Sequence, residues 1–126
     1  MQLSEIQILL ACEVFSGGEH LDRNIQFGCA SDLMSDVLAF SKAGALLLTG
    51  LVTVQTIQTA HIAEIDAIVF ARGKKPDDKV IAQATQKGIP LLGTPYSMYD
   101  ACGILYRHGL ASTMECSQSV DPLNHA

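Results

Sequence analysis

The sequence predicts an α/β fold with three layers, α/β/α, built on a mostly parallel sheet of four to five strands. Three observations lead to this prediction. Residues 25–109 repeat one pattern four times, in which a short apolar run ends at a small residue and a helix-like segment follows. The apolar runs are continuous rather than alternating, as in strands that are covered on both faces. Hydrophobic residues make up 48% of the chain and charged residues 17%, which suits a doubly covered sheet or a subunit that hides surface in a partner.

A helix is expected first, at residues 3–15, and the turn-like segment 16–24 joins it to the four strand–helix units. In the first unit, Ser31 is the expected N-cap and Asp32 suits the positive end of the helix dipole. Gly88 marks the end of the third helix, because glycine readily adopts the left-handed conformation that closes helices. The expected strand–helix pairs are 25–30 with 31–44, 45–50 with 51–64, 67–73 with 74–88, and 89–94 with 95–109.

These elements predict one α/β domain at residues 1–110, since a chain of 126 residues is long enough for a single core. The last stretch, 111–126, lacks apolar periodicity and is expected to be a loosely structured tail.

The charge and hydropathy of the chain argue against two classes of partner, nucleic acids and membranes. The formal net charge of −5 argues against a general nucleic-acid binder, which would present a basic face. No apolar run approaches the roughly 18 to 20 residues of a membrane span, so no membrane partner is expected. The first fifteen residues lack a basic leader and carry Glu5 and Glu13, so we expect a cytoplasmic protein.

Candidate ligand-binding residues follow from the positions at which the predicted parallel strands end. In open parallel sheets, ligands bind beyond the carboxyl ends of the strands, where helix N-termini also point. Glycines, hydroxyls and two fixed positive charges stand at these places, which is what a phosphate or carboxylate ligand needs. The alternative is that the same residues only end strands and cap helices. The predicted ligand-binding residues are Ser31, Asp32, Thr49, Gly50, Thr53, Arg72, Gly73, Lys74, Gly93 and Thr94.

The helix expected at 51–64 is unusual because residues 52–63 carry no Lys, Arg, Asp or Glu. A solvent-facing helix normally carries such charges, whereas the centre of a subunit interface is depleted of them. We therefore expect a homodimer that forms through this helix near Gln55, Gln58 and Thr59. A solvated face that happens to lack charge is the alternative.

No catalytic residue is predicted, because the four histidines are scattered and none has a serine or carboxylate at a meaningful spacing. No cofactor and no metal are predicted either, since the four cysteines form no C-x-x-C pair. Two alternatives stay open. One is a small phosphate-handling transferase or kinase-related enzyme that uses Arg72, Lys74 and Asp32. The other is a metal or iron–sulfur accessory protein in which Cys29 and Cys102 converge at the carboxyl edge of the sheet.

Several segments resemble the DRTGG domain family, namely "ASDLMSDVLAF", "LLLTG", "AIVFARGKKPDDKVIAQA" and "GIPLLGTPYSMYDACGILY". The chain is similar to the N-terminal, non-catalytic domain of HPr kinase/phosphorylase and looks like a stand-alone member. The resemblance covers roughly residues 20–110. It departs from the family pattern where relatives read T-G-D-R-T, since this chain has Thr49-Gly50-Leu51-Val52-Thr53, and where relatives read G-G, since it has Arg72-Gly73.

The resemblance implies a non-catalytic regulatory or binding domain. Related domains lie between CBS modules of regulated pyrophosphatases, and stand-alone members are linked by gene context to iron hydrogenases or to carbon and energy metabolism. Together with the residue pattern, this gives the leading hypothesis. The protein is expected to be a homodimeric sensor of an anionic small molecule, with an adenine nucleotide as one candidate, or a docking module for a metabolic enzyme.

Overall fold

The computed structural model describes residues 1–114, so most of the predicted tail at 111–126 lies outside the described residues and the predicted domain division stays a prediction. The helices and strands in chain order are α1 (Leu3–Leu9), β1 (Glu13–Ser16), the 3-10 helix η1 (Gly18–His20), β2 (Phe27–Ala30), α2 (Met34–Phe40), β3 (Ala45–Thr49), α3 (Val54–Ile62), β4 (Ala67–Phe70), α4 (Asp78–Lys87), β5 (Leu91–Gly93), α5 (Met98–Arg107) and β6 (Ala111–Ser112).

The sheet has six strands in the order β1-β5-β4-β3-β2-β6, and the three-layer α/β/α prediction is confirmed. Every neighbouring pair is parallel except β1 with β5, which is antiparallel. The four predicted strands form the continuous centre of the sheet as β2, β3, β4 and β5. The two additional strands, β1 and β6, lie at its edges and raise the number above the expected four to five.

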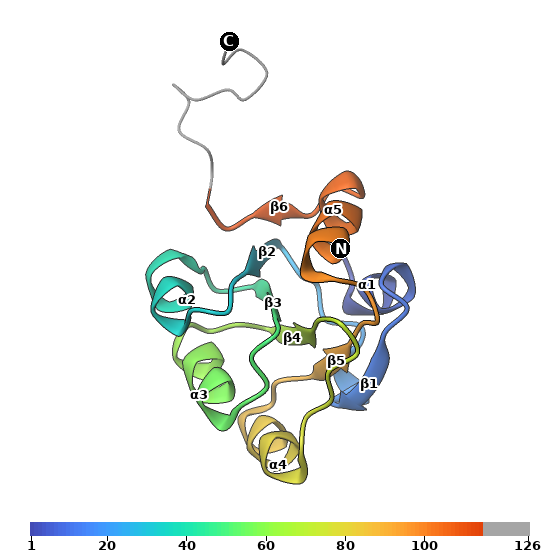
Figure 1. Cartoon of the computed structure of the whole chain (residues 1–126). Helices are drawn as coiled ribbons and strands as arrows, with labels where there is room; N and C mark the ends of the chain where they lie inside the picture. Colours follow the sequence, from blue (N-terminus) through green and yellow to red (C-terminus); the bar gives the residue numbers. More distant parts are fainter. Residues whose placement is uncertain (115–126) are drawn as a thin grey trace.

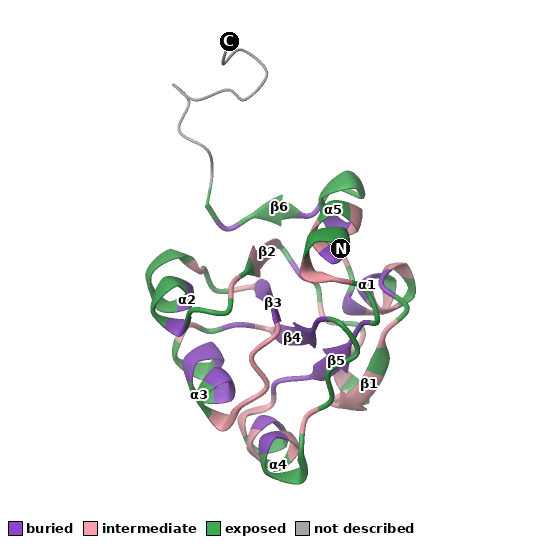
Figure 2. Ribbon diagram, viewed as in Figure 1, coloured by how far each residue is buried: buried purple, intermediate pink, exposed green. Residues whose placement is uncertain are grey.

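Helices cover both faces of the sheet, with α2, α3 and α4 on one side and α1 and α5 on the other (Figure 1). Successive residues of a strand point to opposite faces of the sheet, so the side chains of β3 pack in two separate hydrophobic clusters. Leu47 packs in the cluster under α2, α3 and α4, whereas Leu46 and Leu48 pack in the cluster under α1 and α5. Figure 2 shows the central strands as mostly buried, which explains their continuous apolar runs.

The predicted N-terminal helix at 3–15 is wrong in its second half. Helix α1 ends at Leu9, Ala11 adopts a positive φ of 51°, and the chain then forms β1. Strand β1 pairs antiparallel with β5, with Val14 opposite Leu92. The apolar residues of this segment fit a helix pattern and a strand pattern equally, and pairing with the open edge of β5 decides between the two.

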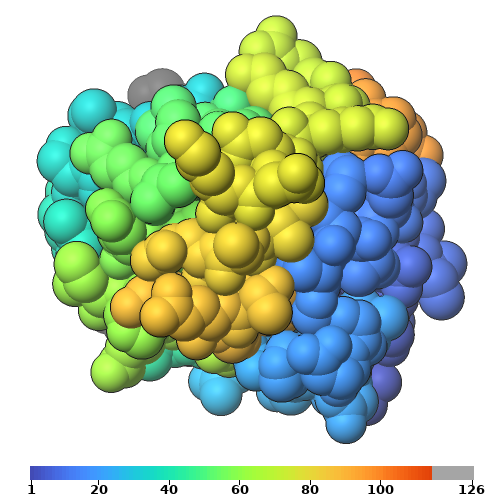
Figure 3. Space-filling view, turned by 90° about the horizontal axis from the view of Figure 1, so that it is seen from below, coloured from blue at the N-terminus to red at the C-terminus, as the bar shows by residue number. Residues whose placement is uncertain are grey.

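The surface seen in Figure 3 places the N-terminal segment beside α4, and β1 contacts this helix. The segment that follows β4, yellow-green in Figure 3, stands out at the edge of the same view. Gly17 holds the N-terminal segment close to the sheet. It has a positive φ of 77°, and a Cβ on it would lie 2.5 Å from the Cα of Pro90. Only glycine fits there without displacing backbone.

The predicted cap of the first crossover helix is also wrong. Helix α2 begins at Met34 with Leu33 at the N-cap position, where no side chain caps the helix. The hydroxyl of Ser31 instead accepts a hydrogen bond from the Leu33 amide in the loop before the helix. By contrast, Gly88 closes α4 in the left-handed conformation, as predicted. Within residues 1–114, no helix has the length and apolar character needed to cross a membrane.

Candidate functional site

The carboxyl ends of β2, β3, β4 and β5 lie along one edge of the sheet, because these strands are parallel and adjacent. Four of the predicted ligand-binding residues meet there in a hydrogen-bonded group that we call the rim network: Asp32, Thr49, Gly50 and Lys74. One oxygen of the Asp32 carboxylate, Oδ1, accepts from the Thr49 hydroxyl at 2.9 Å and from the Gly50 amide at 2.6 Å. On the other side, the Lys74 ammonium donates to the Gly50 carbonyl at 2.8 Å.

The rim network is already occupied by the protein's own carboxylate. A free backbone amide at a strand-to-helix turn is the usual partner of a bound phosphate or carboxylate. Here Asp32 takes the Gly50 amide, so an external anion would have to displace this side chain to reach it. The Thr49–Gly50 turn is therefore built as a structural junction between β2 and β3. Lys74 keeps two of its three ammonium N–H donors for other partners.

The loop after β4 is held to the loop after β5 through its backbone. The Arg72 amide donates to the Tyr96 carbonyl at 2.8 Å, and the Gly73 amide donates to the Thr94 carbonyl at 2.8 Å. Arg72 and Gly73 both have positive φ, at 59° and 69°. These bonds use the backbone N–H donors of the turn. The Arg72 side chain is exposed, and the unusual backbone conformation at this residue sets its direction.

The other predicted residues serve the fold. Thr94 is fully buried, and its hydroxyl donates to the Leu10 carbonyl at 2.6 Å, which ties β5 to the end of α1. Gly93 leaves room for the Phe15 ring, whose Cε2 would lie 2.6 Å from a Cβ at this position. Thr53 caps α3 by accepting from the Thr56 amide at 3.3 Å. The structure thus brings Asp32, Thr49, Gly50 and Lys74 together and keeps Thr53 and Thr94 apart from them as structural groups.

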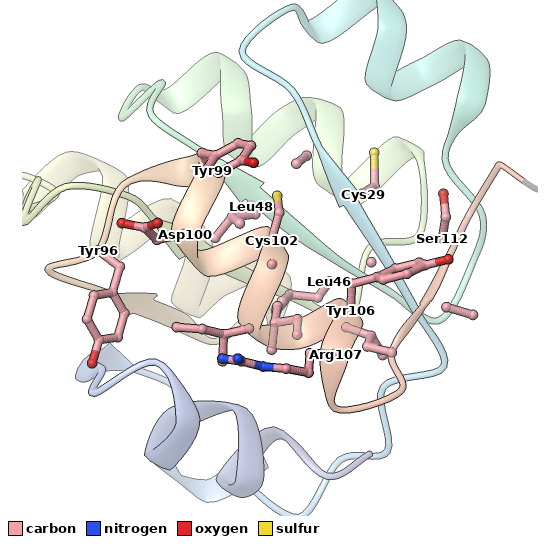
Figure 4. A pocket seen from close by; sticks show the side chains of 17 residues that line it. Cys29, Leu46, Leu48, Tyr96, Tyr99, Asp100, Cys102, Tyr106, Arg107 and Ser112 are labelled. Atoms are coloured by element: carbon pink, nitrogen blue, oxygen red, sulfur yellow. The ribbon is translucent and has the colours of Figure 1, made fainter. Parts of the chain in front are cut away.

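A groove of about 840 Å³ lies beside α5, between this helix and strands β2, β3 and β6. We call it the α5 groove. Its floor includes Leu46 and Leu48, and its walls include Cys29, Cys102 and Tyr106 (Figure 4). This volume is in the range of small-molecule sites. The sequence does not indicate this groove, because the groove depends on β6 and on the direction of α5 across the sheet. The three tyrosines at 96, 99 and 106 were the available signal.

Cys29 and Cys102 line the same groove, as the metal-accessory alternative required. Burial raises the pKa of both thiols, and in the case of Cys102 the charge of Cys29 raises it further. Without a metal, this burial makes both thiols weaker nucleophiles than an exposed cysteine at neutral pH. Among residues 1–114, no group of three or more His, Cys, Asp or Glu side chains is placed to hold a metal ion. Cys116 lies outside the described residues.

Two histidine rings have polar contacts within residues 1–114. His20 approaches Glu19 at 3.6 Å, and His108 contacts the Ile104 carbonyl at 2.8 Å. No hydrogen bond found in the described part of the chain joins a histidine ring to a serine, threonine or cysteine. A nucleophile activated by a neighbouring base needs such a contact.

No protein-family model matches the chain, and no curated protein matches it either. Among solved structures, the fold is similar to the crystal structure of the CBS and DRTGG domains of the regulatory region of Clostridium perfringens pyrophosphatase, which is complexed with its activator, diadenosine tetraphosphate. The TM-score is 0.66 at 15% sequence identity, and the alignment covers 94% of this chain and 52% of that chain. This chain thus spans about half the length of that structure. At this identity the likeness establishes a shared fold, with which a DRTGG-like domain is consistent.

Proposed function

We propose that the protein is a non-catalytic regulatory module that binds an anionic, nucleotide-like small molecule at the loop after β4. The observation that carries the proposal is Arg72. A non-glycine residue in the left-handed conformation costs roughly 1 kcal/mol, and glycine would avoid this cost. Strained positions of this kind cluster at ligand sites. In residues 1–114 the Arg72 side chain forms neither a salt bridge nor a hydrogen bond.

The surroundings of Arg72 suit a nucleotide. Lys74 follows two residues later, and Lys75 lies beside it with its ammonium 3.9 Å from Glu13. Tyr96, whose carbonyl holds the Arg72 amide, is 37% exposed and offers an aromatic face for a base. A guanidinium and an ammonium can contact phosphate oxygens while the tyrosine ring stacks on the base. The activator in the similar pyrophosphatase structure, a diadenosine tetraphosphate, has this chemistry and supports the choice of ligand class.

The test is calorimetric titration of the full chain with ATP, diadenosine tetraphosphate and inorganic phosphate. We expect Arg72→Gly to weaken binding of the nucleotide about tenfold or more, which corresponds to the loss of one charge-assisted contact. The same substitution should leave the unfolding free energy unchanged or raise it by up to about 1 kcal/mol, since glycine relieves the strained φ.

Lys75→Ala is the matched control, because it removes a neighbouring positive charge without touching the strained residue. If both variants weaken binding equally, the effect is general electrostatics and the assignment to Arg72 is wrong. If none of the three ligands binds, the sensor half of the hypothesis fails and the docking module for a metabolic enzyme replaces it.

Self-association through α3 stays a prediction. Thr56 and Thr59 are buried against the protein's own core, so Thr59 offers no surface to a partner. The predicted interface is therefore reduced to Gln55, Gln58 and the neighbouring exposed positions at the end of the helix.

A further inference from the structure

The face of α5 that points away from the sheet exposes an unusual amount of aromatic surface. Tyr99 is 87% exposed and Tyr106 is 75% exposed, and Gly103 lies between them on the same side of the helix. A Cβ on Gly103 would meet nothing within 4 Å. Ala101 and Leu105, on the opposite side, are buried against the sheet. Large exposed aromatic side chains grouped on one face are typical of interaction surfaces.

The exposed residues of α5 are arranged symmetrically about Gly103. Tyr99 and Arg107 lie four residues to either side of it, and Asp100 and Tyr106 lie three residues to either side. Positions three and four apart share one face of a helix. If two α5 helices pack antiparallel around a two-fold axis at Gly103, each flank of the helix meets the same flank of the other copy, so Asp100 of one copy meets Arg107 of the other. By the same symmetry, Tyr99 of one copy meets Tyr106 of the other, because these two residues are seven positions apart and share one flank of the helix.

Both contacts are chemically complementary. A guanidinium forms charge-assisted hydrogen bonds with a carboxylate, and two tyrosine rings attract each other in an offset or edge-to-face arrangement. The opposite charges of Asp100 and Arg107 are available for these contacts, because neither takes part in a salt bridge within residues 1–114. A two-fold interface has to be complementary to itself, and this face meets that condition. Glycine at the axis also lets the two helices approach closely.

We propose that this face of α5 is a homodimer interface, with a second copy of the chain packed antiparallel across Gly103. The partner's helix covers the α5 groove, whose lining includes Tyr99, Tyr106 and Arg107. The face of α3 is less suited to the same role, because its exposed Gln55 and Gln58 provide no aromatic anchor. The ligand site shares Tyr96 with the lining of the α5 groove, whereas Arg72 and the residues of the proposed helix–helix contact are separate.

The first test is sedimentation equilibrium of the full chain over a wide range of protein concentration. We expect a dimer whose dissociation constant rises about tenfold or more in Gly103→Arg, because two bulky like charges meet at the axis. At protein concentrations where both proteins are monomeric, the thermal midpoint of Gly103→Arg should not lie below that of the unsubstituted protein, since the position is exposed and arginine forms helices better than glycine. Gln58→Arg is the matched control on α3 and should leave the dissociation constant unchanged.

A second experiment tests the proposed interface by the formation of a covalent dimer rather than by the loss of a non-covalent one. A short bis-maleimide cross-linker should convert Gly103→Cys into a covalent dimer in much higher yield than the unsubstituted protein or Gln58→Cys. A monomeric unsubstituted protein would overturn the proposal. Dissociation by Gln58→Arg, or preferred cross-linking of Gln58→Cys, would overturn it in favour of the α3 interface. Nucleotide binding by Gly103→Arg is measured alongside, and its loss would instead link the two sites.

Discussion

The rim network and the exposed face of α5 lie on neighbouring parts of one molecule and differ in how their polar groups are used. At the rim, the Asp32 Oδ1 atom, the Thr49 hydroxyl and the amide and carbonyl of Gly50 all have partners within the chain. On α5, large and charged side chains stand in solvent without partners in the described residues. Satisfied polar groups hold a fold together, whereas unsatisfied aromatic and charged ones are available to another molecule. The comparison separates structural chemistry from binding chemistry in this protein.

The largest effect is expected at Thr94, whose hydroxyl is a satisfied polar group in the core. Thr94→Val keeps the size of the side chain but removes the hydroxyl that donates to the Leu10 carbonyl inside the core. We expect a loss of about 2 kcal/mol in the free energy of unfolding, because a buried acceptor is left unpaired. Thr85→Val is the control, since the Thr85 hydroxyl also donates to a carbonyl, that of Ile81, but at the surface. It should change the free energy by less than about 0.5 kcal/mol. Equal effects in urea denaturation would show that burial is not the deciding factor.

A smaller effect is expected at Asp32. Asp32→Ala removes the acceptor of the Thr49 hydroxyl and of the Gly50 amide, and water can replace it because the site is exposed. The free energy of unfolding should fall by about 1 kcal/mol. Asp22→Ala, at an exposed carboxylate in the loop before β2, should have almost no effect. The freed Gly50 amide should also bind inorganic phosphate more tightly than the unsubstituted protein does. Unchanged phosphate binding would mean that Asp32 is not occupying an anion position.

The smallest effect on the free energy of unfolding is expected for the thiols of the α5 groove. Their rate of alkylation should nevertheless differ clearly between the folded and the unfolded chain. Burial raises the pKa of Cys29 and of Cys102 above the ordinary value of 9.0. The folded protein therefore holds these protons after the unfolded chain has begun to lose them. The resulting stabilisation is complete below pH 9 and decreases as the pH rises above it.

Alkylation of Cys29 and Cys102 by iodoacetamide, followed by mass spectrometry, measures this difference. At pH 7.5 both should react more slowly in the folded protein than in the urea-unfolded chain, and the gap should narrow as the pH rises above 9. Fast reaction of either thiol at pH 7.5 would indicate a stabilised thiolate and would revive the metal-accessory alternative.

Much of the fold could be predicted from local patterns. The four apolar runs became β2, β3, β4 and β5, because continuous apolar runs followed by helical periodicity have few other ways to bury themselves. The meeting of Gly50, Gly73 and Lys74 at one edge followed from parallel pairing. The strand β1 was missed, since its residues Glu13–Ser16 carry no pattern that distinguishes a strand from the end of a helix.

The candidate sites could be predicted only in part. The residue types at the strand ends indicated Asp32 and Lys74. They did not indicate that the Asp32 carboxylate accepts a hydrogen bond from the Gly50 amide. That bond joins residues 18 positions apart and depends on the register of β2 against β3. The α5 groove likewise depends on β6, a strand of two residues that no periodicity can reveal.

The sequence by itself determined which segments form the central strands and the helices that follow them, because the spacing of apolar residues sets secondary structure at short range. The tertiary structure alone decided which polar groups are satisfied and which remain available. Hydrogen bonds such as that between Asp32 and Gly50 close across strands that are distant in sequence, and exposure of Tyr99 and Tyr106 depends on what the rest of the chain leaves uncovered. Both are properties of distances in space, which a linear pattern does not contain.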